Sequence, residues 1–241
     1  MDVIWFILLI VGAYILGSVP TAYLITRWRR GIDIRKYGSG NVGAANVSAV
    51  VSKRWSIPVT VFDIGKGALT VWVAQLLGLG AAQQVTVGIF TVIGHNWPIF
   101  LRFKGGRGIF TTTGVILILS PKLGLIALVM SYALAPLRQL SLGVSLALVS
   151  LPIFSWFLSQ PLGIEQRLPI TLGFVVLALV GLSRRLLAPR THLSESVSPV
   201  ELFFNRLLFD RDIRDRKAWI SQTRSMEQPL EQEGEQESVD Y

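Results

Sequence analysis

The sequence predicts an all-α, polytopic membrane protein of about seven transmembrane helices with cytoplasmic glycine-rich loops. Hydrophobic residues make up 51% of its 241 residues and charged residues 16%. The mean hydropathy is +0.52, which is too apolar for a soluble domain of this size. The apolar residues form runs long enough to cross a bilayer, and short basic clusters separate these runs, as is typical of membrane helices joined by loops.

Charge divides the chain into two unlike parts. Residues 1–187 hold 16 Lys and Arg against 4 acidic residues, whereas residues 188–241 hold 7 against 11. We expect residues 1–187 to form a membrane domain, residues 188–220 a cytoplasmic amphipathic extension, and residues 221–241 a disordered acidic tail. The tail leaves open the possibility of a protein partner.

The composition also narrows the function classes. The chain has no cysteine and 2 histidines, which excludes thiol chemistry and leaves few ligands for a metal. We therefore expect no metal and no other cofactor. Nucleic acid is not the expected partner, although the pI is near 10.2, because the basic residues do not gather on one soluble face. Lipid headgroups and phosphorylated substrates fit the clusters better.

The candidate spans follow from length, since about 30 Å of hydrocarbon takes roughly 20 helical residues. A stretch at residues 109–137 is interrupted by Ser120, Pro121 and Lys122, so it forms either one kinked helix or two short ones. The clearer spans are residues 3–26, 57–78, 83–101, 141–158 and 169–187.

Orientation follows from the basic residues of the short loops. The connection at residues 78–82 carries no charge, so it is expected outside together with the N-terminus, and the C-terminus is expected in the cytoplasm. Because this rule places both Arg107 and Arg138 in the cytoplasm, the chain between them must cross the membrane an even number of times. This favours two short helices within residues 109–137 and seven spans in total. The other inside residues are Arg27, Arg29, Arg30, Arg35, Lys36, Lys53, Arg54, Arg102, Lys104, Arg184 and Arg185.

The extension contains apolar residues at helical spacing. An amphipathic helix with this pattern lies either on the membrane surface or on the cytoplasmic loops of the protein itself, and the pattern fits both equally. The residues are Val200, Phe203, Phe204, Leu207 and Leu208.

Two glycine-rich loops are the candidate anion sites. Residues 38–46 combine three glycines with short polar side chains, which can form an anion-binding nest but are as typical of a plain turn. Residues 104–108 are more specific, because Lys104 and Arg107 flank a Gly-Gly step and can neutralise an oxyanion. The candidate substrate-binding residues are Gly38, Ser39, Gly40, Asn41, Gly43, Asn46, Gly105, Gly106 and Gly108.

Three ionisable residues are expected in or beside the spans. Asp63 and Lys66 lie three apart on one helical face, which favours an intramembrane ion pair slightly over a role of Lys66 in substrate binding. His95 is a candidate general base or a candidate hydrogen-bond donor to a phosphate. The plainer interpretation is a hydrogen-bonded structural histidine at the membrane edge.

Both loops resemble a known family. Residues 38–47 and residues 94–108 resemble the first two signature motifs of the bacterial acyl-phosphate glycerol-3-phosphate acyltransferases. Residues 63–67 match a further family pattern, and Arg138 with Ser141 resembles the region before the penultimate span. The resemblance covers residues 1 to about 187.

The resemblance implies transfer of a fatty acyl group from acyl phosphate to the 1-hydroxyl of glycerol 3-phosphate. It implies a multi-pass enzyme of the bacterial inner membrane, in phospholipid biosynthesis, that uses neither coenzyme A nor a metal. Lys104, Arg107, His95 and Ser141 are the candidate catalytic residues. No Ser-His-Asp set is visible, which leaves the donor's own phosphate as a proton acceptor.

Two departures from the family are visible. Ala49 stands where the family has an arginine for glycerol 3-phosphate, so Lys53 or Arg54, about one helical turn away, is expected to supply that cation. A third family motif of His-Arg-x-Asn type is not found after the last span, where only Arg184 and Arg185 occur. A non-catalytic paralogue that binds lipid phosphates or a protein is therefore the alternative, and a transporter fits less well because intramembrane charges are few.

Overall fold

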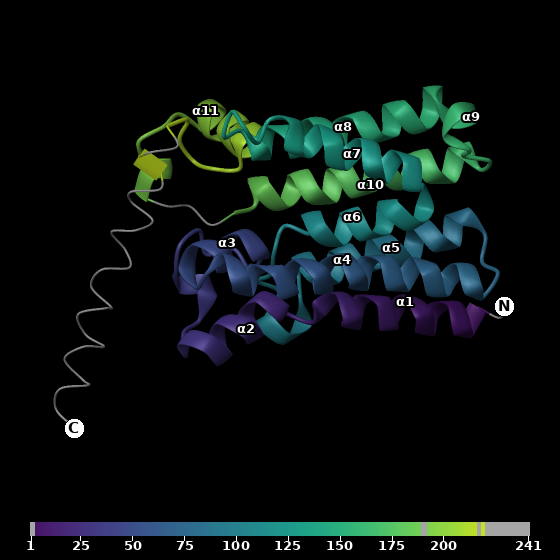
Figure 1. Ribbon diagram of the computed structural model, residues 1–241, viewed down its shortest axis with the longest axis horizontal. Coiled ribbons are helices and arrows are strands. Elements are labelled where there is room, and N and C mark those ends of the chain that lie inside the picture. The colour runs from purple at the N-terminus through teal and green to yellow at the C-terminus, as the bar shows by residue number, and fades with distance from the viewer. Residues whose placement is uncertain (1–2, 189–191, 216–217, 220–241) are drawn as a thin grey trace.

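The computed structural model describes residues 3–188, 192–215 and 218–219. These residues form a bundle of helices, which confirms the all-α prediction (Figure 1). The predicted disordered tail at residues 221–241 lies outside the described residues. The long helices are α1 (Val3–Ser18), α4 (Lys53–Leu76), α5 (Ala81–Asn96), α6 (Ile109–Leu119), α7 (Pro121–Ala133), α8 (Leu140–Phe157) and α10 (Arg167–Leu186), and the short ones are α2 (Thr21–Arg30), α3 (Ala44–Val50), α9 (Ser159–Leu162) and α11 (Pro199–Phe204).

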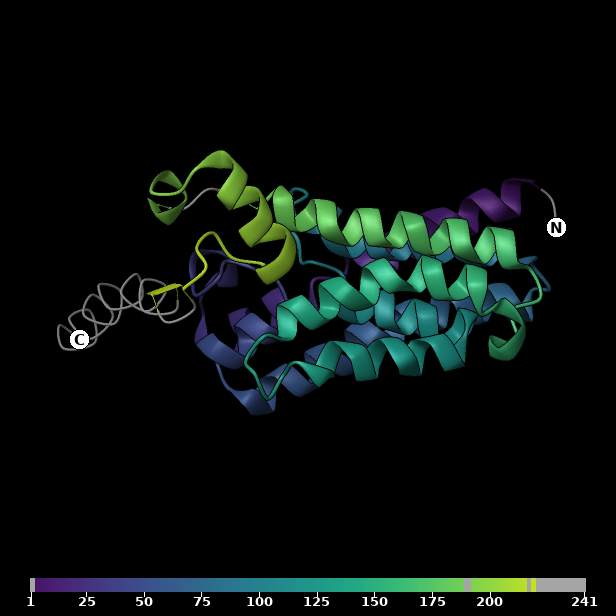
Figure 2. The same ribbon diagram turned by 90° about the horizontal axis from the view of Figure 1, so that it is seen from above.

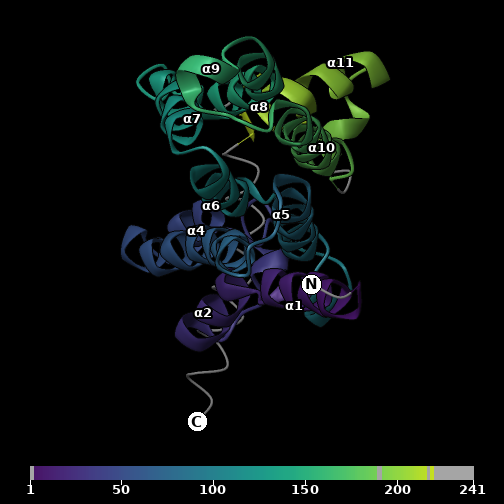
Figure 3. The ribbon, with the colours of Figure 1, turned by 90° about the vertical axis from the view of Figure 1, so that its right-hand side faces the viewer.

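The long helices lie side by side in layers. Seen end on, α1 lies below α4, α5 and α6, and α7, α8 and α10 lie above them (Figure 3). The short helices α2, α3 and α11 gather at one end of the bundle, and the N-terminus lies at the other end (Figure 1). Both glycine-rich loops therefore lie at the end opposite the N-terminus, because each one precedes or follows a helix at that end. We call this end, which carries the two loops and α2, α3 and α11, the polar end.

Proline decides where several helices end. The predicted span 3–26 is broken at Val19 and Pro20, because proline lacks the N–H that a continuous helix needs. The predicted span 83–101 stops as a helix at Asn96, two residues before Pro98, and continues as a separate 3₁₀ turn. The end of α5 is a correction to the sequence prediction, whereas the first stretch, although its helix is interrupted, still lies within Val3–Arg30, which is long and apolar enough to span a membrane.

The stretch 109–137 forms two helices, α6 and α7, as the parity of the loops favoured. Ser120 is extended, and Pro121 occupies the first position of α7, where a missing N–H costs nothing. Within the part of the chain that the structure describes, four stretches are long and apolar enough to span a membrane, and α6 and α7 are shorter apolar helices. The count of seven spans stays a prediction. The four stretches are Val3–Arg30, Lys53–Leu76, Leu140–Phe157 and Arg167–Leu186.

Glycines allow the helices to approach closely. A β-carbon on Gly67 would collide with the carbonyl of Thr111, and one on Gly114 with the carbonyl of Ile64, so α4 and α6 touch backbone to backbone. In a bilayer, where lipid is as apolar as the side chains, close van der Waals packing of this kind drives helix association. The same contact joins α1 to α5, where glycine faces a carbonyl at Gly17 and Gly94.

The C-terminal extension folds back onto the polar end of the bundle (Figure 2). It contains α11 and a π-helical turn at Asn205–Phe209 in place of one regular amphipathic helix. The turn contacts α8 and α10, while Val200, Phe203 and Phe204 are exposed. Packing on the protein's own polar end is therefore observed, and contact of the exposed apolar side chains with a membrane stays a prediction.

Candidate active site

Asn46 holds the first glycine-rich loop in shape. Its side-chain oxygen accepts a hydrogen bond from the Ser39 N–H at 3.1 Å. Its side-chain nitrogen lies within 3.3 Å of the carbonyl oxygens of Ile34, Tyr37 and Asn41. The residue is 2% exposed, so it shapes the loop from inside instead of facing a ligand.

The glycines of this loop have different tasks. Gly38 and Gly40 have φ angles of +57° and +65°, a region that other residues rarely adopt. Gly43 precedes α3 as its N-terminal flanking residue. The turn that results presents Ser39 to a cavity, described below, whereas Asn41 is half-buried beside it.

Arg184 of α10 holds the second loop. Its guanidinium donates to the carbonyl oxygens of Asn96 and Gly106, each at 3.2 Å, and of Gly105 at 3.0 Å. The Gly106 N–H donates to the carbonyl oxygen of His95 at 3.1 Å. The basic-residue pattern assigned Arg184 only a role in topology, because contacts to residues 78 positions away along the chain leave no local pattern.

Close packing leaves no room for a side chain at Gly105 or Gly106. A β-carbon on Gly105 would collide with the carbonyl of His95, and one on Gly106 with the imidazole of His95 and the carbonyl of Val42. Gly108 has a φ of +71° where α6 begins. The loop is therefore pressed against His95, and this contact fixes the position from which Lys104 and Arg107 project.

His95 belongs to a buried ionic group. The Lys66 ammonium lies 2.9 Å from Asp63 and 2.9 Å from Nδ1 of His95. It also donates to the carbonyl oxygens of Gly17 and Val19, at the break between α1 and α2. The predicted Asp63–Lys66 ion pair is confirmed. Through Lys66 it connects the break between α1 and α2 to the His95 imidazole, which packs against the second loop.

Among the cavities of the described residues, two sizeable ones are lined by residues of the glycine-rich loops. The larger encloses about 880 Å³ and combines basic residues with apolar and aromatic walls. Such a surface suits an amphiphilic molecule with an anionic head. Its residues include Tyr23, Arg35, Lys36, Gly40, Trp97, Phe100, Arg102, Phe103, Lys104, Gly105 and Arg184.

The smaller cavity encloses about 230 Å³ and is lined mainly by polar residues. Six basic and two acidic side chains line it, a formal excess of four positive charges. A small, strongly anionic ligand suits this lining. The residues are Arg35, Lys36, Gly38, Ser39, Gly40, Arg107, Arg185, Ala188, Arg206, Asp210, Arg211, Asp212 and Trp219.

Arg35, Lys36 and Gly40 line both cavities, which therefore meet at the first loop. Arg35 is fixed by Asp33 at 2.6 Å, and the hydrogen bond from this guanidinium lowers the pKa of Asp33. Lys104 lines the larger cavity and Arg107 the smaller. The two cations that the sequence pattern grouped around one phosphoryl group thus face different cavities.

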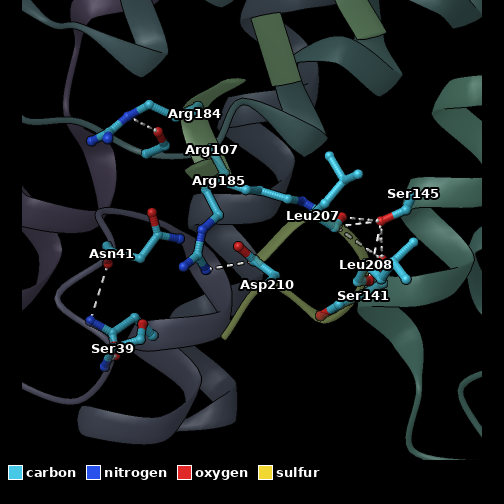
Figure 4. A network of polar contacts seen from close by, with 12 residues as sticks. Ser39, Asn41, Arg107, Ser141, Ser145, Arg184, Arg185, Leu207, Leu208 and Asp210 are labelled. Atoms are coloured by element: carbon cyan, nitrogen blue, oxygen red, sulfur yellow. Dashed lines mark hydrogen bonds and ion pairs between the residues drawn. The ribbon is translucent and has the colours of Figure 1, made fainter. Parts of the chain in front are cut away.

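The extension enters the smaller cavity through Asp210. Its carboxylate pairs with Arg107 at 2.7 Å (Figure 4). Burial raises the pKa of Asp210, and the charges of Arg107, Arg185 and Arg184 offset this only in part. Sequence reasoning missed Asp210, since an acidic residue in a mixed-charge run is usually solvated.

The turn that carries Asp210 is anchored on both sides. Arg185 donates to the Ser145 hydroxyl and to the Leu207 carbonyl (Figure 4). Arg206 pairs with Asp212 at 2.7 Å. The backbone and side-chain contacts together fix the turn against α8 and α10.

The remaining predicted residues lie at the margin of the site. Ser141 offers its backbone carbonyl to Arg185 at 3.2 Å. Lys53 and Arg54 are exposed on the first turn of α4, and Ala49 is exposed on α3. Of the described residues that line the two cavities, none is Lys53, Arg54 or Ala49.

Fold and site together define a multi-pass membrane protein with two adjoining cavities, both lined by basic residues, at one end of its helix bundle. A family model described as glycerol-3-phosphate acyltransferase matches residues 7–188. The chain belongs to this family.

Individual relatives agree. Glycerol-3-phosphate acyltransferase 5 of Dehalococcoides mccartyi strain 195 is 46% identical over 216 residues, which cover 90% of this chain and 93% of the relative. Glycerol-3-phosphate acyltransferase 4 of strain CBDB1 matches to the same extent. A crystal structure of PlsY, an integral membrane glycerol 3-phosphate acyltransferase, in its glycerol 3-phosphate form, superposes with a TM-score of 0.68 at 28% identity, covering 79% of this chain and 98% of that one.

Proposed function

We propose that this protein transfers a fatty acyl group from acyl phosphate to the 1-hydroxyl of glycerol 3-phosphate in the bacterial inner membrane. The products are lysophosphatidic acid and inorganic phosphate. Family membership supports the acyl transfer and the acceptor. The observation that carries the proposal furthest is the pair of cationic cavities that meet at Arg35, Lys36 and Gly40.

The larger cavity suits the donor. Trp97, Phe100 and Phe103 offer apolar surface to an acyl chain that arrives from the bilayer, and Lys104 offers a positive charge to its phosphate. The flanking Gly105 brings bare backbone close to the same position. Acyl phosphate is the simplest donor with both features, and it needs neither coenzyme A nor a metal.

The smaller cavity suits the acceptor. Arg107 and Arg185 face a volume that accommodates a small phosphate, with Ser39 beside them. Charge-assisted hydrogen bonds from guanidinium groups to a phosphate dianion are stronger than those from neutral donors. Holding the two substrates in adjoining cavities lowers the entropic cost of their reaction.

The test is release of inorganic phosphate from acyl phosphate by the purified protein, with and without glycerol 3-phosphate. We expect release to depend on the acceptor and to yield lysophosphatidic acid. Acyl-coenzyme A serves as the matched donor control and should give no product. Binding of both phosphates without turnover would refute the proposal and support the non-catalytic alternative.

A further inference from the structure

The C-terminal extension forms part of the wall of the smaller cavity. The family model matches the chain only up to residue 188, yet several lining residues of this cavity lie beyond that point. The extension is therefore in a position to act on whatever binds there. The lining residues that it supplies are Arg206, Asp210, Arg211, Asp212 and Trp219.

One contact joins the extension to the second glycine-rich loop. Oδ2 of Asp210 lies 2.7 Å from Nη1 of Arg107, and the two side chains are only 13% and 20% exposed (Figure 4). Opposite charges attract more strongly when they are shielded from water. Oδ1 of Asp210 is buried and Oδ2 is engaged by Arg107. Asp210 therefore acts on a ligand of this cavity through Arg107 and not by direct contact.

The bundle holds the turn that carries Asp210 on both sides. Before this residue in the chain, the Leu207 carbonyl oxygen accepts hydrogen bonds from Arg185 at 3.1 Å and from the Ser145 hydroxyl at 3.0 Å. After it, Asp212 pairs with Arg206 at 2.7 Å, and Arg206 also donates to the Leu186 carbonyl oxygen at 3.1 Å. The position of the Asp210 carboxylate is thus set by α8 and α10, whether or not a ligand is bound.

The Arg107 guanidinium needs such a support. Arg107, Arg184 and Arg185 all lie close enough to Asp210 to interact with its charge. Three guanidinium groups repel one another, and the carboxylate among them offsets this repulsion. Arg107 projects from a loop, whereas Arg184 and Arg185 belong to α10. Without Asp210, the loop arginine is the one that would be displaced.

We propose that Asp210 is a positioning residue, which holds the Arg107 guanidinium toward the phosphate of glycerol 3-phosphate. A guanidinium carries five N–H donors, and Asp210 engages it at Nη1, so donors remain for a phosphate. An arginine that is already held loses less side-chain entropy when the phosphate binds. This inference rests on the proposed function, which assigns the acceptor to the smaller cavity. The extension is then a built-in part of the acceptor site.

The test uses Asp210→Ala in the full-length protein, with the Kd of glycerol 3-phosphate measured by calorimetry and its KM by steady-state kinetics. Both should rise about tenfold, as expected when a charge-assisted contact is weakened. The KM for acyl phosphate should change by less than about twofold, because Lys104 and not Arg107 lines the larger cavity. Asp210→Glu keeps the carboxylate and should recover part of the binding.

The matched control is Glu201→Ala. Glu201 is an exposed acidic residue of α11 in the same extension, so its loss changes the charge of the extension without touching Arg107. It should leave both constants for glycerol 3-phosphate unchanged. An equal rise in this variant would mean that the net charge of the extension, and not the position of Arg107, controls binding, and would overturn the proposal.

A double-mutant cycle separates positioning from a general structural role. In an Arg107→Ala background, Asp210→Ala should not weaken glycerol 3-phosphate binding further, because Asp210 acts through Arg107. Additive losses would show that Asp210 only stabilises the fold, and would overturn the proposal. Tighter binding in the single Asp210→Ala variant would also overturn it, since the carboxylate would then compete with the phosphate.

A second variant decides if Asp210→Ala does not fold. Asp210→Asn keeps the shape of the side chain and removes its charge, so glycerol 3-phosphate binding should still weaken, and unchanged binding overturns the proposal. The inference and the proposed function fail differently. A wild type that binds glycerol 3-phosphate without turnover refutes the proposed function, and calorimetry still tests Asp210. An active wild type with equally tight binding in both Asp210 variants refutes only the role of Asp210, and a wild type that does not bind glycerol 3-phosphate refutes both.

Discussion

At the scale of single residues, Arg107 connects the family motif to the extension. Its guanidinium lines the smaller cavity and contacts Asp210 at 2.7 Å. The Arg107→Ala variant should lose roughly ten- to a hundred-fold in kcat/KM, since a charge-assisted contact contributes about 1.5 to 3 kcal/mol. Steady-state kinetics measure this loss. The control is Arg30→Ala, because Arg30 is an exposed arginine at the end of α2. Equal losses in both variants would show a general effect of charge.

The cation expected to replace the family arginine at Ala49 can be located by a second pair of variants. The sequence predicted Lys53 or Arg54, but basic residues that line the smaller cavity, such as Arg185, are placed better. The Lys53→Ala/Arg54→Ala double variant should therefore change the KM for glycerol 3-phosphate by less than about twofold, whereas Arg185→Lys should raise it, because lysine cannot reproduce the planar fork. A sharp rise in the double variant would instead assign the role to Lys53 or Arg54.

At the scale of elements, the second glycine-rich loop is fixed by contacts that leave no room for a side chain. A β-carbon on Gly106 would collide with His95 and Val42, so Gly106→Ala should displace the loop and lower kcat at least tenfold, through loss of alignment. Gly65, on α4, has no atom within 4 Å of its β-carbon position. Gly65→Ala should keep full activity and raise the melting temperature slightly. An active Gly106→Ala enzyme would show that the loop tolerates movement.

The same loop explains why part of the site could be predicted. The glycines and cations of residues 104–108 are adjacent in sequence, so their pattern alone indicates an anion site. The division of Lys104 and Arg107 between two cavities depends on the direction in which the loop leaves His95. That direction is set by Arg184, a residue from another helix.

At the scale of the whole molecule, the orientation in the membrane can be tested directly because the chain has no cysteine. Helix α2, which ends at Arg30, lies at the polar end, and α9, which precedes the exposed Glu165 in the chain, lies at the other end (Figure 1). With a membrane-impermeant maleimide, Glu165→Cys should react in intact cells, and Arg30→Cys only after permeabilisation. The reverse pattern would place both glycine-rich loops outside.

Sequence patterns predicted the membrane class, the approximate spans and the family motifs, and they favoured two helices over one within residues 109–137. These features depend on composition, on proline and on neighbours along the chain, so they are local. Long-range packing brings Asp210 to Arg107, places Arg184 against the second loop and makes the two cavities share Arg35. These contacts join segments far apart in the chain. They depend on how the helices pack and on where the extension folds back, which no local pattern specifies.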